Sequence, residues 1–206
     1  MSQRRFVIVV FAFLLSGAIS CSTPPLEIVD SEAKLNEPLF RDFEPTAEHP
    51  FGRPNPRAPE ELAQFEFLIG EFDAQVRRRL PDGSWFEEMI LWQASYILNG
   101  HAIQDRTWSD TAATTSIRFF DTNQGKWRVS YQAKPGNIFG FVWEGVKSDD
   151  QMVLTSTYPN GDGDAIFSRL TFHDITPTGF EWTSEETNQR TGETLVDWTI
   201  SARRRL

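Results

Sequence analysis

The strongest constraint on the fold is a succession of strand-like segments, joined by short turns, that fills the chain from Glu71 to Arg203. Within the segments apolar and polar residues alternate, as they do in β-strands, where successive side chains point to opposite faces. The expected strands are residues 71–80, 85–97, 101–109, 115–121, 126–132, 137–146, 151–158, 165–174, 180–187 and 194–203. The connections are rich in turn-forming residues, such as Pro81-Asp82-Gly83 and Asn99-Gly100. Since no connection has room for a crossover helix, the strands are expected to pair antiparallel.

About ten short antiparallel strands have a physical reason to form a closed sheet, because closure removes exposed strand edges. The sequence therefore predicts an all-β chain with a single up-and-down barrel over residues 65–206. A sandwich of two sheets is the alternative architecture. The chain has a single cysteine, Cys21, so no disulfide can form within it and the core has to hold the fold together.

The N-terminus has the three-part pattern of a secretory signal peptide. Residues 1–20 contain a basic pair, an apolar run and then small residues, and the run is too short for a comfortable membrane span. The tetrapeptide that ends at Cys21, Ala18-Ile19-Ser20-Cys21, resembles the lipobox of bacterial lipoproteins, with Ala18 where that motif usually has Leu. The resemblance implies lipidation of Cys21, and Ser22 after it resembles the pattern that directs lipoproteins to the outer membrane, facing the periplasm. A plain secretory leader is the alternative.

Residues 21–64 are expected to be a flexible tether. Residues 22–64 contain eight prolines and show no sustained period of 2 or 3.6. At the end of this segment, residues 59–64 have the composition of a short helical turn, with Pro59 near its start and acids in its first turn. Such a turn is expected to pack on one end of the barrel.

Three sequence elements resemble a known family. They are the entry strand Leu68-Ile69-Gly70-Glu71-Phe72, the hairpin turn Pro81-Asp82-Gly83 and the turn Leu98-Asn99-Gly100. Together they make residues 51–205 similar to an uncharacterised bacterial family of lipocalin-like, calycin-type barrels. The resemblance implies a cavity large enough for a ligand, and it supplies no catalytic residue.

Net charge and aromatic content limit the kinds of molecule that this chain is expected to bind. The formal net charge is −9, and removal of a leader that carries Arg4, Arg5 and no acid makes it −11. Such an acidic protein repels phosphate backbones, so nucleic acid is not an expected partner. The membrane, through a lipid on Cys21, and a small apolar molecule are the expected partners. Seven tryptophans and seventeen phenylalanines would either line a pocket or fill the core.

Eight residues in the strand segments are candidates for ligand contact. The aromatic candidates are Trp92, Phe139, Phe141 and Trp143, and the polar candidates are Glu88, Arg118, Tyr131 and Arg169. If their face is interior, Glu88 is expected to form a buried ion pair with Arg118 or Arg169, because a buried charge needs a partner. The alternative is a salt bridge outside the barrel or at its end.

No motif in the sequence points to a metal, a cofactor or a nucleophile. The histidines, His49, His101 and His173, lack any local ligand spacing. The sequence therefore predicts an envelope lipoprotein whose barrel binds a small apolar or amphipathic molecule. Two alternatives remain open: a calycin-type enzyme, similar to an isomerase or hydratase, that uses the same cavity, and a solidly packed interaction module.

Overall fold

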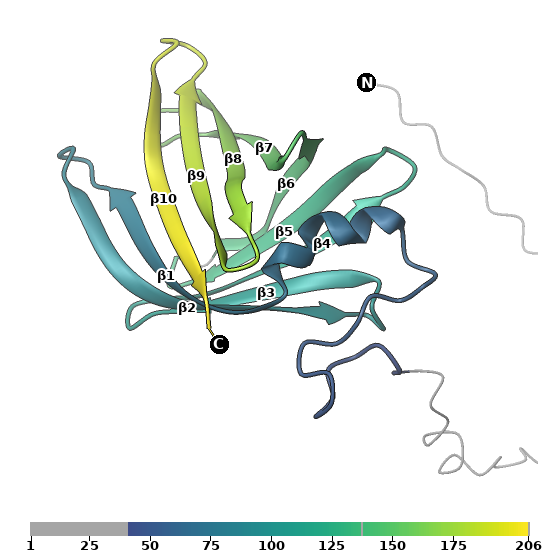
Figure 1. Ribbon diagram of the computed structural model, residues 1–206. Coiled ribbons are helices and arrows are strands. Elements are labelled where there is room, and N and C mark those ends of the chain that lie inside the picture. Colours follow the sequence, from purple (N-terminus) through teal and green to yellow (C-terminus); the bar gives the residue numbers. More distant parts are fainter. Residues whose placement is uncertain (1–40, 137, 206) are drawn as a thin grey trace, which may run out of the picture. The chain divides into compact units, whose positions relative to one another are not determined.

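The protein forms a closed antiparallel β-barrel in the computed structural model, which describes residues 41–136 and 138–205, without the side chain of Phe139 (Figure 1). The strands are β1 (Gly70–Arg79), β2 (Trp85–Ile97), β3 (Ala102–Trp108), β4 (Ala113–Asp121), β5 (Lys126–Lys134), β6 (Ile138–Ser148), β7 (Gln151–Pro159), β8 (Ala165–Thr176), β9 (Gly179–Asn188) and β10 (Thr194–Arg204). Each strand pairs with its neighbours in sequence, and β1 pairs with β10 to close the ring. The predicted all-β barrel of about ten strands is confirmed, and the two-sheet sandwich is excluded.

The alternation of residue types decides which face of each strand is interior. In β1, Phe72, Ala74 and Val76 are buried, while the residues between them, such as Asp73 and Gln75, are exposed. This pattern has the period of two that a half-buried strand requires. The apolar face of each strand therefore supplies the core, and the charged residues cover the outside.

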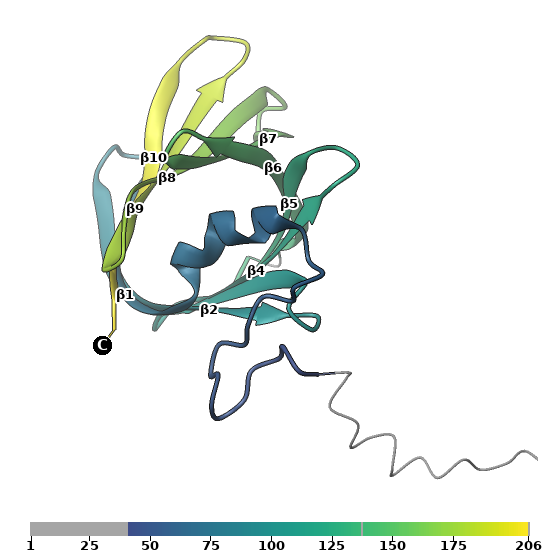
Figure 2. The same cartoon turned by 45° about the vertical axis from the view of Figure 1, so that its right-hand side comes forward.

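One end of the barrel is closed by the 3-10 helix η2 (Glu60–Leu68), which crosses the opening of the ring in Figure 2. Its buried residues are Leu62, Phe65 and Leu68. The Phe65 ring lies 4.7 Å from the Trp127 ring, centroid to centroid and nearly perpendicular to it. The helical turn expected near residues 59–64 is present in this helix and packs on one end of the barrel, as predicted.

The entry strand joins this helix to the end of the chain. Gly70 has φ +129°, and a Cβ on it would lie 2.5 Å from Nη1 of Arg204. Arg204 donates hydrogen bonds to the carbonyl oxygens of Ile69 (2.6 Å) and Phe67 (2.9 Å), and its guanidinium lies 4.6 Å from the Phe72 ring centroid. The glycine of the entry motif thus leaves room for an arginine from β10 that ties the helix end to the barrel seam.

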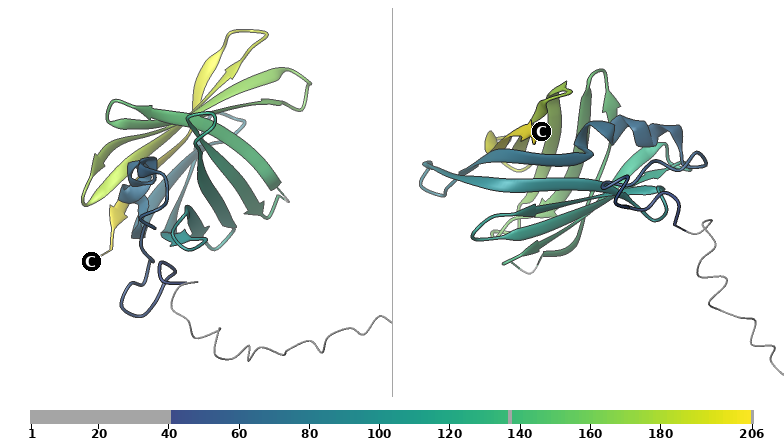
Figure 3. Two further views of the ribbon diagram at one scale, coloured as in Figure 1. Left: turned by 90° about the vertical axis from the view of Figure 1, so that its right-hand side faces the viewer. Right: turned by 60° about the horizontal axis from the view of Figure 1, so that its bottom comes forward.

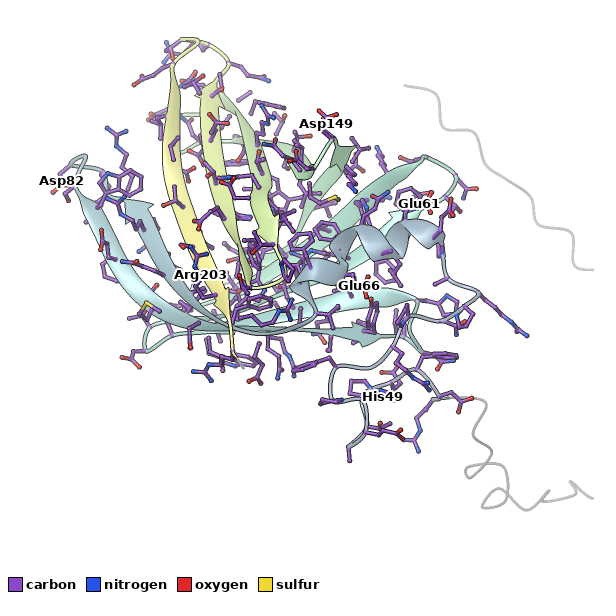
Figure 4. The ribbon with its side chains drawn as sticks, in the orientation of Figure 1. His49, Glu61, Glu66, Asp82, Asp149 and Arg203 are labelled. Carbon is purple, nitrogen blue, oxygen red and sulfur yellow. The ribbon has the colours of Figure 1, made fainter. Side chains whose placement is uncertain are left out.

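The described part of the expected tether, residues 41–64, contacts the barrel before and within the helix. The segment that precedes the helix runs along the outside of the strands in Figure 3, and His49 lies on it, away from the barrel interior, in Figure 4. Asn55 is buried; its backbone N–H donates to Gly100 O (3.0 Å) and its side-chain amide to Asn99 O (3.0 Å). Since Asn99 and Gly100 have positive φ, their turn presents these carbonyl groups to the segment. The packed region therefore begins before residue 65, the start expected from the sequence.

The predicted leader, residues 1–20, and Cys21 lie outside the described residues. Among the residues that are described, no helix combines the length and apolar character needed to span a membrane.

Candidate functional site

The barrel encloses a cavity of about 460 Å³ between the helix η2 end and the opposite opening. Its wall is formed largely by aromatic side chains from seven strands, namely Trp92, Tyr131, Phe141, Trp143, Tyr158, Phe172, Trp182 and Trp198. Smaller apolar side chains lie between them, namely Ile90, Val129, Ile138, Leu154, Leu170 and Ile200. A volume of this size suits a small organic molecule rather than a few waters.

The candidate residues fall into three groups: those that line the cavity, those that the structure does not describe, and those that lie outside the cavity lining. Trp92, Arg118, Tyr131, Phe141 and Trp143 line the cavity, which shows that the face they share with their apolar neighbours is the interior one. The side chain of Phe139, in β6, lies outside the structural description, and so does the whole of Cys21.

Two of the charged candidates do not line the cavity. Glu88 is half-buried and accepts a hydrogen bond from the Thr111 hydroxyl (3.2 Å), in the loop between β3 and β4. Arg169 is exposed on the outer face of β8, opposite Glu185 of β9. On β8 the inward residues are instead Ser168 and Leu170, one position to either side of Arg169.

The buried ion pair expected for Glu88 exists with a different acid. Arg118 is paired with Asp105, and their side chains are only 4% and 3% exposed. The register of β3 and β4 sets Asp105 opposite Ser116, two positions from Arg118, and the Ser116 N–H donates to Asp105 Oδ1 (3.1 Å). The expected buried ion pair of Glu88 with Arg118 or Arg169 is therefore wrong, because the cross-strand register brings Asp105 to the Arg118 guanidinium.

This ion pair lies at the helix end of the cavity. The Arg118 guanidinium lies 5.1 Å from the Phe65 ring centroid and 5.9 Å from that of Phe172. Phe65 belongs to η2, so the pair stands between the helix and the open volume. These two aromatic rings stabilise the positive charge of Arg118, which has little contact with water.

A second polar group, which sequence reasoning missed, lines the cavity on β7, β9 and β10. Its members are Tyr158, Glu186 and Asp197. The Tyr158 hydroxyl donates a hydrogen bond to Glu186 Oε1. Burial raises the pKa of Asp197 to about 6; a hydrogen bond with Ser184 opposes the rise, and the charge of Glu186 adds to it. Burial likewise raises the pKa of the Tyr158 hydroxyl, with the hydrogen bond to Glu186 contributing, so Tyr158 is a neutral donor.

Several polar atoms of the cavity wall are buried without a partner. Among the described residues they include Trp92 Nε1, Arg118 Nε, Trp198 Nε1 and Asp197 Oδ1. A buried donor or acceptor that makes no hydrogen bond costs about 1–3 kcal/mol. All four atoms belong to residues that line the cavity, and each has almost no surface that a water molecule can reach.

The closed meander of ten antiparallel strands, with a helix across one end and a cavity inside, defines a lipocalin-like, calycin-type barrel. No family model matches the chain, and no curated protein matches it. The resemblance to an uncharacterised bacterial family therefore stays a prediction. Among solved structures, the chain is similar to the S-type phycobiliprotein lyase CPES from Guillardia theta, at 13% identity and a TM-score of 0.48, over 69% of this chain and 90% of that chain.

Proposed function

We propose that this barrel binds a small amphipathic molecule in its interior. The observation that carries the proposal is the cavity of about 460 Å³, whose largely aromatic wall also contains the polar side chains of Tyr158, Glu186 and Asp197. Ligand sites in proteins are typically cavities of about 300–1,000 Å³ with mostly apolar walls and a few polar groups that orient the ligand. The same volume argues against a solidly packed interaction module.

The test is a titration of intrinsic tryptophan fluorescence with a panel of lipids, quinones and haem. Trp92, Trp143, Trp182 and Trp198 line the cavity, so an occupant changes their emission. The substitution Leu170→Trp fills the cavity and is expected to weaken binding at least about tenfold.

Val146→Trp is the matched control, because Val146 is 48% exposed and does not line the cavity. Thermal unfolding of both variants separates loss of binding from loss of fold. No saturable response to any member of the panel would contradict a binding function.

An enzyme that uses the same cavity is the second candidate function, and Asp197 favours it. A carboxyl group whose pKa is raised to about 6 in a largely apolar cavity is suited to exchange protons near neutral pH. The two functions differ in what becomes of the ligand. A binding protein returns it unchanged, whereas an enzyme yields a product that mass spectrometry detects and that Asp197→Asn abolishes.

We also propose that the chain is exported and held on the bacterial envelope by lipid on Cys21. The proposal rests on the leader of residues 1–20 and on the lipobox-like tetrapeptide. Several acyl chains, each contributing about 0.8 kcal/mol per buried CH₂, hold a protein firmly on a bilayer. Cells grown with a radioactive fatty acid are expected to label the wild type and not Cys21→Ser. A wild-type protein without label would exclude the anchor.

A further inference from the structure

We propose that the ligand of this cavity carries a basic nitrogen, which binds as an ammonium ion against Asp197 and Glu186 with its apolar body against the aromatic wall. The inference rests on the proposed binding function and gives the chemical class of the ligand. Its evidence lies in a strand irregularity, in the balance of charge inside the barrel and in the polar atoms at the two ends of the cavity.

A β-bulge brings the Asp197 carboxylate into the barrel. The pairing of β10 with β9 shifts register between Val196 and Trp198, and Asp197 is the residue without a partner in that ladder. Asp197 and Trp198 are consecutive, yet both line the cavity, whereas neighbours in a regular strand face opposite sides. Bulges redirect side chains in this way. The strand thus departs from its regular pattern at the position where it turns an acid inward.

Charge inside the cavity is not balanced. Of the described residues that line it, Arg118 is the only basic one, and its partner is Asp105. Glu186 and Asp197 therefore have no cation opposite them in the lining. The Tyr158 hydroxyl donates to Glu186, which stabilises a carboxylate but does not neutralise it. A cationic ligand supplies the missing charge, and an anionic ligand would add to the repulsion.

Aromatic rings beside the acids suit the same ligand. Trp182 and Trp198 are in edge-to-face contact at 5.7 Å between ring centroids, and Phe141 lies 5.4 Å from Tyr158 and 5.3 Å from Trp143. All five residues line the cavity. The faces of such rings attract ammonium ions, most strongly where water is excluded.

The polar groups at the helix end of the cavity differ from those beside Asp197. Trp92 and Arg118 are 5% and 3% exposed, both line the cavity, and neither Trp92 Nε1 nor Arg118 Nε has a partner. Trp92 pairs with Phe72 near the helix, while Trp198, next to Asp197, pairs with Arg78 toward the far end of β1. The helix end of the cavity therefore holds the neutral pair of Arg118 and Asp105, and the two acids without a cation lie toward the other end.

The test compares three nearly isosteric ligands by isothermal titration calorimetry at pH 8: 1-naphthylmethylamine, 1-naphthalenemethanol and 1-naphthoate. The wild type is expected to bind the amine at least about tenfold more tightly than the alcohol, and the acid most weakly. In the double variant Glu186→Gln, Asp197→Asn, the amine should lose that advantage while the affinity for the alcohol changes by less than about twofold. Glu185→Gln, one position along β9 and outside the cavity lining, is the matched control and should behave as the wild type.

Each other result has a distinct meaning. If the alcohol binds and the amine binds no more tightly, the inference is overturned and the binding function stands. If none of the three ligands binds, the inference is overturned and the fluorescence panel then decides whether the binding function falls with it. A preference for the amine that survives in the double variant would remove Asp197 and Glu186 from the site.

Discussion

At the scale of single residues, the barrel interior holds charge in two different forms. Asp105 and Arg118 neutralise one another, and each also contacts groups that support its charge: the Ser116 N–H for the acid and the Phe65 ring for the arginine. Asp197 has a partner for only part of its carboxylate, because Oδ1 makes no hydrogen bond. The first group stabilises the fold only as an intact pair, whereas the second leaves binding capacity unused.

Replacement of Arg118 by Met is expected to destabilise the protein by about 3–5 kcal/mol, because it leaves the Asp105 carboxylate buried and uncompensated. The double variant Asp105→Leu, Arg118→Met removes both charges and should recover much of that loss. Urea unfolding of the wild type and both variants measures the effect. A single variant as stable as the wild type would mean that water or another group satisfies Asp105.

Sequence alternation placed Arg118 on the same face as Phe120, but it identified neither this face as the interior one nor the acid that pairs with Arg118. The closed barrel puts this face inside. Asp105 carries an equivalent signal, since it alternates with Ile103 in its own strand. Which acid meets the arginine depends on the register of β3 against β4, and hairpin register is decided by turn geometry that a single sequence does not specify.

At the scale of elements, helix η2 connects the closed end of the barrel to the site. The Phe65 ring contacts the rings of Trp127 and Phe172, and Trp127 Nε1 donates to Gln64 Oε1 (3.0 Å). Phe172 also lines the cavity, so one ring separates the helix from the ligand volume. The helix thus supports the floor of the cavity through the Phe172 ring and contributes no residue to the lining.

Phe65→Ala is expected to cost about 3–5 kcal/mol of unfolding free energy, because Phe65 is fully buried and its removal leaves a void under Arg118. Phe119→Ala is the matched control, because it makes the same substitution at an exposed position. Phe119 is 42% exposed, so this variant should lose less than about 1 kcal/mol of unfolding free energy. Thermal or urea unfolding compares the two. Equal costs for the two variants would show that the helix does not contribute to the core.

The elements themselves were largely predictable, and their irregularities were not. Period-two alternation and turn residues placed ten strands within a few residues of their observed bounds, as with 85–97 for β2. The bulge at Asp197 was not predicted, and the expected strand 194–203 runs through it without interruption. A bulge arises from the fit of two strands, so only their pairing reveals it.

At the scale of the whole molecule, Asp197 links folding stability to pH. Its pKa is about 6 in the folded protein, against about 3.9 in an unfolded chain, so the folded state binds the proton more tightly. The stabilisation is therefore complete below about pH 4 and is lost as the pH rises through about 6. Burial is the main cause of the raised pKa of Asp197; the hydrogen bond with Ser184 lowers this pKa and the charge of Glu186 raises it further.

Asp197→Asn is accordingly expected to be more stable than the wild type at pH 7.5, by about 1 kcal/mol once partial exposure of the carboxyl to solvent is allowed for. At pH 3.5 the two proteins should differ little. Urea unfolding at half-unit steps between these values gives the comparison. If the difference in unfolding free energy between the two proteins stays constant from pH 3.5 to 7.5, the pKa of Asp197 is not raised by folding.

The seam between β1 and β10 has a consequence for how the chain reaches this structure. Arg205 and Asp73, whose side chains form an ion pair across it, are 132 positions apart, and the pairing of Phe72 with Arg204 completes the ring beside the helix. Such distant contacts place a protein toward the slow end of folding rates, because the entropy of closing a long loop has to be overcome first. The hairpins from β1 to β9 can form as the chain emerges during synthesis, but the barrel has two open edges until its final eleven-residue strand arrives. During synthesis, closure is therefore expected to come last, and the ligand volume is expected to form only with it.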